Sequence, residues 1–165
     1  MNSISLEDIT EIPDEIVNLV RESVINTFAS ICGGEPEYLK QSEKSGPLNG
    51  IIGNIAVFNH DHTLSLMIVI PKDTALSLSE IFIGAQIPFE SDDMGDLVGE
   101  ISNILAGDVA ASVETIGFRG QSSLPTATRG SDLTLFMPNK PPTKKMKFNG
   151  PTGEFWVNMA LTESR

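Results

Sequence analysis

The sequence is poor in cysteine and in positive charge, and each shortage excludes a class of protein. Its one cysteine, Cys32, cannot form a disulfide within the chain, and its place at the end of an apolar helical pattern predicts a small buried hydrophobe. Only 11 lysines and arginines stand against 22 acids, which gives a formal net charge of −11. Such a charge repels phosphate backbones, so we expect neither nucleic acid nor an anionic membrane surface as a partner.

Long apolar runs are absent as well. No uninterrupted run reaches the length that spans a bilayer, and residues 1–14 are acidic and lack the basic and apolar regions of a secretion signal. We therefore expect a cytoplasmic protein. With 165 residues, 40% of them hydrophobic, the chain is long enough for one domain with a sizeable core and short for two, so we expect a single domain over residues 1–165.

Helical and strand-like patterns divide the chain. Apolar residues recur at helical spacing over residues 13–31 and 92–115, and a shorter helix is expected between Pro71 and Gly84. Segments rich in β-branched and aromatic residues predict strands. These segments are 38–39, 50–59, 63–70, 125–129, 133–137, 145–148 and 154–161, with 50–59 and 63–70 paired as an antiparallel hairpin.

The order of these segments predicts the architecture. A long helix followed by strands occurs twice, which indicates a degenerate internal helix-plus-strands duplication. Helices grouped apart from hairpin-connected strands are typical of the α+β class. We expect an antiparallel β-sheet with the two long helices packed on it.

The second long helix has an apolar face and a polar stripe. On a helical wheel its apolar residues share one broad arc that should face the core. This arc holds Met94, Leu97, Val98, Ile101, Ile104, Leu105 and Val109. A separate band of about 60° holds Asp96, Glu100, Asn103 and Gly107, with Gly99 and Ala110 beside it. The helix should therefore present a polar stripe on its outer side.

Glu100 and Asn103 carry the functional hypothesis. Being three residues apart, they lie about 4.5 Å apart along the helix axis and can reach one small target together. Gly99 and Gly107 each cost about 1 kcal/mol relative to alanine in a helix interior, so they call for a packing or docking reason. An isolated pair of this kind is usually an ordinary solvated helix face. The surrounding sequence decides between the two readings.

The surrounding sequence points to a family. The run Asp96-Leu-Val-Gly-Glu100-Ile-Ser-Asn103-Ile-Leu-Ala-Gly107 is followed some twenty residues later by Pro125, after a hairpin, a short helix and a long amphipathic helix. In motif and layout together the chain resembles the CheC/CheX family of response-regulator phosphatases over most of its length. Their motif is an acid or serine, three residues, glutamate, two residues, asparagine, and a distant proline.

The resemblance implies a reaction and a partner. The partner is a phosphorylated CheY-like receiver domain, which supplies Mg²⁺ and a lysine, so no cofactor is expected in this chain. Asn103 would orient the attacking water, and Glu100 would contact the receiver's lysine. Asp96 matches the first motif position, although a helix-capping or solubilising role is equally consistent with its place. The resemblance also implies a homodimer, formed by joining sheet edges.

The first long helix carries at most a defective copy of the motif. When Leu19-Val-Arg-Glu22 is aligned with the segment that ends at Glu100, Ile25 takes the place of Asn103. Asn26 lies one residue further, but Arg21 replaces the small Gly99 and would obstruct close approach. We therefore expect one active helix, as in CheX, rather than two as in CheC.

The other polar clusters in the sequence predict no catalytic or metal site. His60 and His62 have no evident third metal ligand, so we expect no metal site. The hydroxyl residues around Pro125 come without the histidine and carboxylate of a serine nucleophile. The basic cluster Lys140, Lys144, Lys145 and Lys147 is interpreted as a solvated loop with edge-strand protection, or alternatively as a docking patch for an acidic partner.

The expected function is hydrolysis of aspartyl phosphate on a CheY-like receiver. The alternative is a non-catalytic CheC-like adaptor that binds a receiver or a flagellar-switch protein. A third interpretation is a ligand-binding α+β domain that binds no phosphorylated receiver. Asn103 discriminates between the first two, because only the phosphatase needs its carboxamide for activity.

Overall fold

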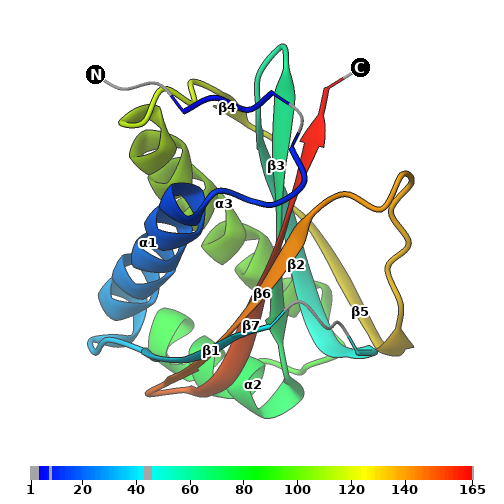
Figure 1. The fold of residues 1–165 in the computed structure, drawn as a ribbon. Helices are drawn as coiled ribbons and strands as arrows, with labels where there is room; N and C mark the ends of the chain where they lie inside the picture. Colours follow the sequence, from blue (N-terminus) through cyan, green and yellow to red (C-terminus); the bar gives the residue numbers. More distant parts are fainter. Residues whose placement is uncertain (1–3, 8, 43–45, 165) are drawn as a thin grey trace.

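Seven strands form one antiparallel sheet in the computed structural model, which describes residues 4–7, 9–42 and 46–164 (Figure 1). The strands are β1 (Glu37–Ser42), β2 (Leu48–Phe58), β3 (His62–Ile70), β4 (Gln121–Ser122), β5 (Thr126–Leu133), β6 (Thr143–Gly150) and β7 (Gly153–Glu163). Their order is β1-β6-β7-β3-β2-β4, and β5 also pairs with β2. The helices are α1 (Asp14–Cys32), α2 (Lys72–Ile83) and α3 (Asp92–Glu114). The predicted α+β class is confirmed.

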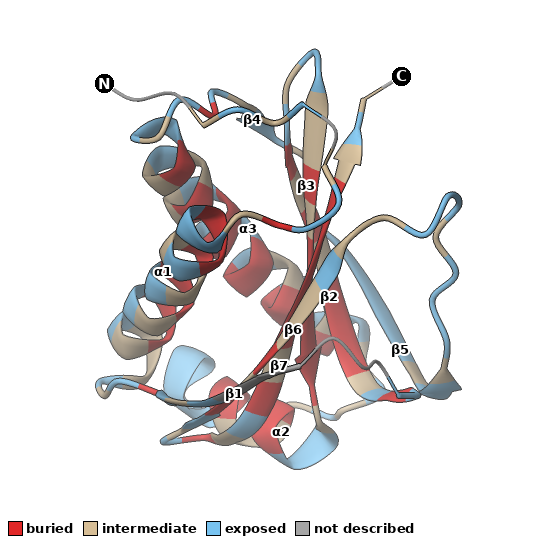
Figure 2. Ribbon diagram, viewed as in Figure 1, coloured by how far each residue is buried: buried red, intermediate tan, exposed pale blue. Residues whose placement is uncertain are grey.

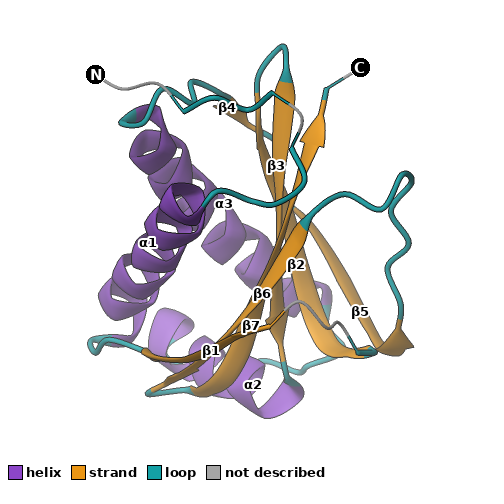
Figure 3. Ribbon diagram, viewed as in Figure 1, coloured by secondary structure: helices purple, strands orange, loops and turns teal. Residues whose placement is uncertain are grey.

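The helices gather on one face of the sheet, and the opposite face carries no helix in the described part of the chain (Figure 3). α1 and α3 lie side by side, and buried residues line their inner sides and the facing side of the central strands (Figure 2). Burial of this apolar surface is the main term that holds the helices on the sheet. None of the helices in the described residues is both long and apolar enough to cross a bilayer.

The helix ends agree with the sequence signals. α1 ends at Gly33 and α2 at Gly84, each with a positive φ, 71° and 89°, that glycine adopts without strain. α3 begins after Ser91, whose Oγ accepts a hydrogen bond from the Met94 amide at 3.2 Å. Ser91 rather than Asp96 therefore caps this helix, and Asp96 lies exposed further along the helix.

α3 packs closely on β2 because one strand residue has no side chain. A Cβ atom added at Gly53 would collide with Ser102 Oγ and would lie 3.2 Å from Val98 Cγ1. Ser102 is fully buried, and its hydroxyl donates to the Val98 carbonyl at 2.7 Å. The helix face that contains Ser102 is thereby pressed onto the sheet, which turns the opposite face of α3 outward.

Several sequence interpretations are corrected. Residues 134–137 form no strand, since β5 ends at Leu133, and the two-residue β4 was not foreseen. Ile104, placed on the core arc, is 41% exposed because it lies at the border of the buried face. Cys32 is half-buried rather than buried, and this burial raises the pKa of its thiol.

The interpretation of the basic cluster as protection of a sheet edge is also wrong. Lys144, Lys145 and Lys147 lie on β6, which pairs with β1 on one side and with β7 on the other, so they do not protect a sheet edge. The ammonium groups of Lys145 and Lys147 lie 5.9 and 5.4 Å from the Trp156 ring centre, and Lys147 pairs with Glu154 at 3.2 Å. Lys145 and Lys147 therefore belong to the helix-free face of the sheet.

Replacing Gly53 tests the contact between β2 and α3. Gly53→Ala should lower the free energy of unfolding by about 1–3 kcal/mol, because the new methyl group forces Ser102 and the helix to shift. Urea denaturation followed by circular dichroism measures this loss. In the double variant Gly53→Ala/Ser102→Ala part of the loss should be recovered, since the colliding hydroxyl is gone. Equal stability of Gly53→Ala and the unaltered protein would contradict the close packing.

Candidate functional site

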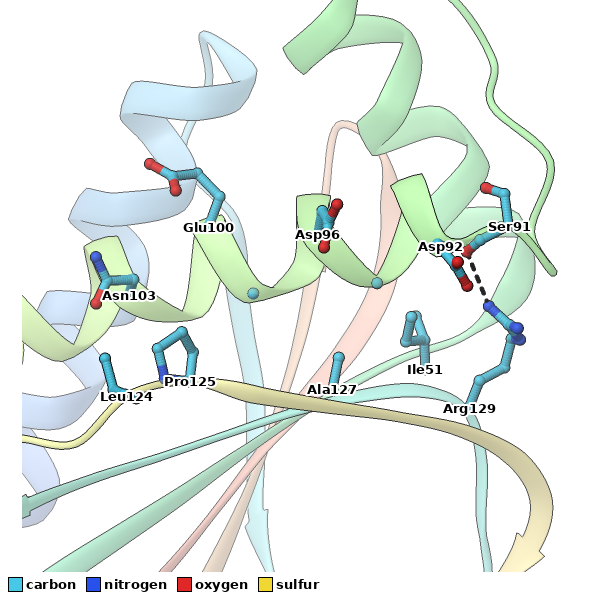
Figure 4. A pocket seen from close by; sticks show the side chains of 12 residues that line it. Ile51, Ser91, Asp92, Asp96, Glu100, Asn103, Leu124, Pro125, Ala127 and Arg129 are labelled. Atoms are coloured by element: carbon cyan, nitrogen blue, oxygen red, sulfur yellow. Dashed lines mark hydrogen bonds between the residues drawn. The ribbon is translucent and has the colours of Figure 1, made fainter.

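A groove of about 1010 Å³ runs between α3 and the start of β5 (Figure 4). It is lined by residues from α3, from the segment before that helix, from β2 and from the segment that leads into β5. These are Ile51, Ser91, Asp92, Gly95, Asp96, Gly99, Glu100, Asn103, Leu124, Pro125, Ala127 and Arg129. Five of the six residues proposed from the sequence therefore meet in one groove, and the sixth, Gly107, is exposed on the same helix but does not line it.

Glu100 and Asn103 project from neighbouring turns of α3 and are both exposed (Figure 4). Among the residues that the structure describes, neither side chain makes a hydrogen bond or an ion pair. One carboxylate and one carboxamide thus stand ready for an external target, with no internal bond to break first. An exposed carboxylate and an amide that can both accept and donate are suited to recognising a charged group and positioning a small polar molecule.

The glycines of α3 have no internal packing role. A Cβ atom at Gly95, Gly99 or Gly107 would meet no atom of the described chain within 4 Å, apart from the local helix backbone and chain neighbours. None of the three has a positive φ. Of the two reasons that the sequence suggested, packing within this chain is therefore removed. Close approach by another molecule stays the prediction for these glycines, and Gly95 and Gly99 border the groove.

Pro125 is held at the groove by the segment before it. The Ser123 amide donates to the Ala56 carbonyl at 2.8 Å, and Ser123 Oγ accepts from the Ala56 amide at 2.9 Å. These bonds fix the chain to β2 directly before Leu124 and Pro125. In Figure 4 both residues lie next to Asn103. Leu124 is 88% exposed and was not foreseen, although an apolar residue directly before the motif proline could have indicated it.

Arg129 closes the other end of the groove and was also not foreseen. Its guanidinium donates to three backbone carbonyls in the segment that precedes α3: those of Phe89 at 3.0 Å, Glu90 at 2.7 Å and Ser91 at 3.1 Å. It also lies 5.9 Å from the Phe89 ring centre. Arg129 thereby ties β5 to the start of α3 and sets the width of the groove at that end.

The equivalent positions on α1 form a different surface. Ile25 is half-buried and packs against the main core, so the position aligned with Asn103 is a core contact. The Arg21 guanidinium lies 5.3 Å from the Tyr38 ring centre rather than projecting freely. Glu22 and Asn26 are exposed. A single active helix remains the prediction.

His60 and His62 each lie close to another polar group of the chain. His60 Nδ1 lies 3.2 Å from the neighbouring Asp61 carboxylate, and His62 Nε2 lies 3.2 Å from the Leu6 carbonyl. Within residues 4–7, 9–42 and 46–164, no group of three or more histidine, cysteine, aspartate or glutamate side chains is arranged to hold a metal ion. His60 makes a local contact in the turn between β2 and β3, whereas His62 contacts the N-terminal segment.

The fold and the groove define a CheC-like α+β protein. Several solved structures share this fold. One is a CheC-like superfamily protein from Shewanella sp. PV-4 (TM-score 0.82, 18% identity, covering 92% of this chain and 99% of that one). A second is the chemotaxis protein CheX of Vibrio vulnificus (TM-score 0.80, 20% identity, covering 90% of this chain and 99% of that one). A third is CheX of Borrelia burgdorferi in complex with CheY, BeF3 and Mg²⁺ (TM-score 0.73, 18% identity, 90% and 98% covered).

The family itself is shown by sequence. The model of the family described as "Chemotaxis phosphatase CheX" matches residues 51–144, which is more than half of the chain. The chain belongs to the CheX family. The search of the curated proteins gave no match.

Removing the Arg129 side chain tests how the groove is held open. Arg129→Ala should lower the free energy of unfolding by only about 1 kcal/mol, because the three lost hydrogen bonds are exposed to solvent. It should also speed amide hydrogen exchange at the start of α3. Hydrogen exchange measured by NMR reports this locally. Arg119→Ala, which removes another exposed arginine, is the control and should leave exchange there unaltered. Unchanged exchange in Arg129→Ala would contradict the tethering role.

Proposed function

We propose that this chain stimulates hydrolysis of aspartyl phosphate on a CheY-like receiver domain. The observation that carries the proposal is the joint exposure of Glu100 and Asn103, without internal partners, in a groove of a CheX-family protein. The Borrelia burgdorferi CheX structure, a protein of the same fold bound to CheY with Mg²⁺, supports a receiver as the partner. The sequence resemblance implies the same two residues.

The role proposed for Asn103 follows from what a receiver lacks. A receiver already holds its phospho-aspartate with Mg²⁺ and a lysine, so hydrolysis mainly needs a water aligned opposite the leaving oxygen. The Asn103 carbonyl oxygen can accept from that water while its NH2 group donates to a phosphoryl oxygen. Because the carboxamide is neutral, it approaches the anionic phosphoryl group without the repulsion that a carboxylate would meet.

The role proposed for Glu100 is orientation. Its carboxylate, one turn from Asn103, can form a charge-assisted contact with the receiver's lysine. Asp92 and Asp96 also line the groove, so this surface attracts a positively charged region of a partner. Mg²⁺ belongs to the receiver in this proposal, and no cofactor is required of this chain.

Leu124, Pro125 and the glycines would form the contact surface around the reacting groups. Leu124 offers an exposed apolar side chain beside Asn103, and Gly95 and Gly99 leave the helix surface low enough for a partner's backbone to approach. Such a combination, apolar contact next to small residues, is typical of a site that excludes water around a few polar groups.

The homodimer remains part of the proposal. It rests on the sequence resemblance and on the sheet itself, in which β1 and β5 lie at opposite edges. β5 is exposed along most of its length, so its outer edge can pair with a strand of a second copy. Analytical ultracentrifugation is the direct measurement of this state.

Substitution of Asn103 tests the proposed chemistry. Asn103→Ala should return the decay of a phosphorylated CheY-like receiver to its spontaneous rate, while binding to the receiver weakens by less than about threefold, because water orientation rather than affinity is lost. Label retained on the receiver over time measures the rate, and calorimetry measures binding. Asn26→Ala, which removes an exposed asparagine of α1, is the matched control and should keep full activity.

The outcomes separate the phosphatase from the adaptor. Binding of the receiver without faster decay, in the unaltered chain and in Asn103→Ala alike, would establish the adaptor. Faster decay that survives Asn103→Ala would remove Asn103 from the mechanism and leave the activity to other groups.

Gly99 tests whether the groove is a docking surface. Gly99→Ala should raise the free energy of unfolding by up to about 1 kcal/mol, because alanine favours a helix and the new methyl group meets no atom of this chain. Gly99→Leu should weaken receiver binding at least tenfold by occupying space meant for the partner. Thermal unfolding and calorimetry measure the two effects. Gly107 does not line the groove, so Gly107→Leu is the control and should weaken receiver binding less. Full receiver affinity in Gly99→Leu would contradict docking at this groove.

A further inference from the structure

The helix-free face of the sheet carries a second groove, of about 840 Å³. Its floor is formed by outward-facing residues of the central strands, among them Met67 and Asn158, and its wall by the loop of residues 134–142 that arches beside the sheet at the right of Figure 1. The loop of residues 134–142 lies on the side of the sheet that the helices do not cover (Figure 3). Of its lining residues, the proposed phosphatase site uses only Leu124, which lines both grooves.

The charge of this groove is opposite to that of the protein. Lys140, Lys144 and Lys145 line it, and none of its described lining residues is an aspartate or a glutamate. The chain as a whole carries a formal net charge of −11. Three lysines around one hollow in such a chain create a local positive potential, which favours an anionic occupant and disfavours a cationic one.

A buried acceptor in the groove has no partner. Asn158 pairs through its backbone with Met67 on β3 and Lys145 on β6, and its side chain lines the groove between them. The residue is only 9% exposed, and its Oδ1 accepts no hydrogen bond within the described part of the chain. An unpaired buried acceptor is unfavourable. An occupant that brings an N–H donor would satisfy it.

The rim of the groove is apolar and exposed. Phe136 is 86% exposed and Leu135 is 53% exposed, and both lie on the loop that forms the wall. Large apolar side chains at the rim of a hollow are typical of surfaces that bind another protein, because their apolar area is buried only in the complex.

We propose that this groove binds a peptide segment of a partner protein that carries acidic and apolar side chains. Acidic side chains match the three lysines, apolar side chains match Leu135 and Phe136, and a backbone N–H group supplies the donor that Asn158 Oδ1 lacks. A fatty acid or a similar amphipathic anion would satisfy the first two requirements but brings no N–H donor.

The test uses synthetic ten-residue peptides and the full chain. A fluorescent peptide of alternating glutamate and leucine should bind, with anisotropy as the readout, whereas versions with lysine for glutamate or serine for leucine should bind at least tenfold more weakly. Phe136→Ser and Lys140→Glu should each weaken binding at least tenfold. Phe82→Ser and Lys72→Glu, exposed residues of α2 outside this groove, are the matched controls and should leave it unchanged.

Asn158 gives a readout that a merely structural residue would not give. Asn158→Leu removes the unpaired acceptor, so it should raise the thermal unfolding temperature of the free chain. The same substitution should weaken binding of the glutamate–leucine peptide at least tenfold. Lower stability together with unchanged binding would show that Asn158 serves the fold alone and would overturn its part in the site.

The remaining outcomes contradict the proposal. No binding of the glutamate–leucine peptide, or equal binding of its lysine version, would overturn it. Binding of laurate, lost in Lys140→Glu, with no binding of the peptide, would define a site for a small amphipathic anion instead. A dimer in sedimentation experiments that dissociates in Phe136→Ser would assign the face to a second copy of this chain.

Discussion

The close contact between β2 and α3 is the constraint on which the site depends. Because Gly53 has no side chain, α3 can press the face that carries Ser102 and Val98 directly onto the sheet. A helix buried on one side must expose the residues roughly half a turn away, and these are Asp96, Glu100 and Asn103. The strand that allows the contact also holds the segment before Pro125, through Ala56 and Ser123. One strand thus positions both walls of the groove.

The two faces of the sheet carry opposite charges at their grooves. The groove on α3 is lined by Asp92, Asp96 and Glu100, with Arg129 turned to backbone carbonyls at one end, whereas the groove on the helix-free face is lined by lysines and by no acid among its described residues. Leu124 lines both grooves. In the proposed account, the acidic groove binds the region of a receiver that holds its lysine and Mg²⁺, and the basic groove binds an acidic segment, so the two surfaces would select different partners.

Local signals in the sequence predicted most of the fold. The breakers Gly33 and Gly84 and the turn at Asn59 end elements within one or two residues of the predicted positions, because these signals act through nearby backbone geometry. The segment at 134–137 was wrongly predicted as a strand since its apolar residues lie exposed in a loop beside a groove. The lysines of β6 were wrongly placed at an edge because strand order depends on long-range pairing, which no local pattern encodes.

The site was predictable to the extent that it lies on one helix. Glu100, Asn103, Asp96 and Gly99 share a stripe that the helical period fixes, so their proximity followed from spacing alone. Leu124 and Arg129 come from another part of the chain, and their approach depends on how β5 pairs with β2. Pro125 was identified through the family resemblance rather than from geometry. The internal duplication remains a prediction from the order of elements.

The most direct measurement is the decay of a phosphorylated CheY-like receiver in the presence of a small molar fraction of the unaltered chain. The account predicts loss of the phosphoryl group well above the spontaneous rate, with each molecule of the chain serving many receivers in turn. Decay at the spontaneous rate, under conditions in which the chain demonstrably binds the phosphorylated receiver, would contradict it.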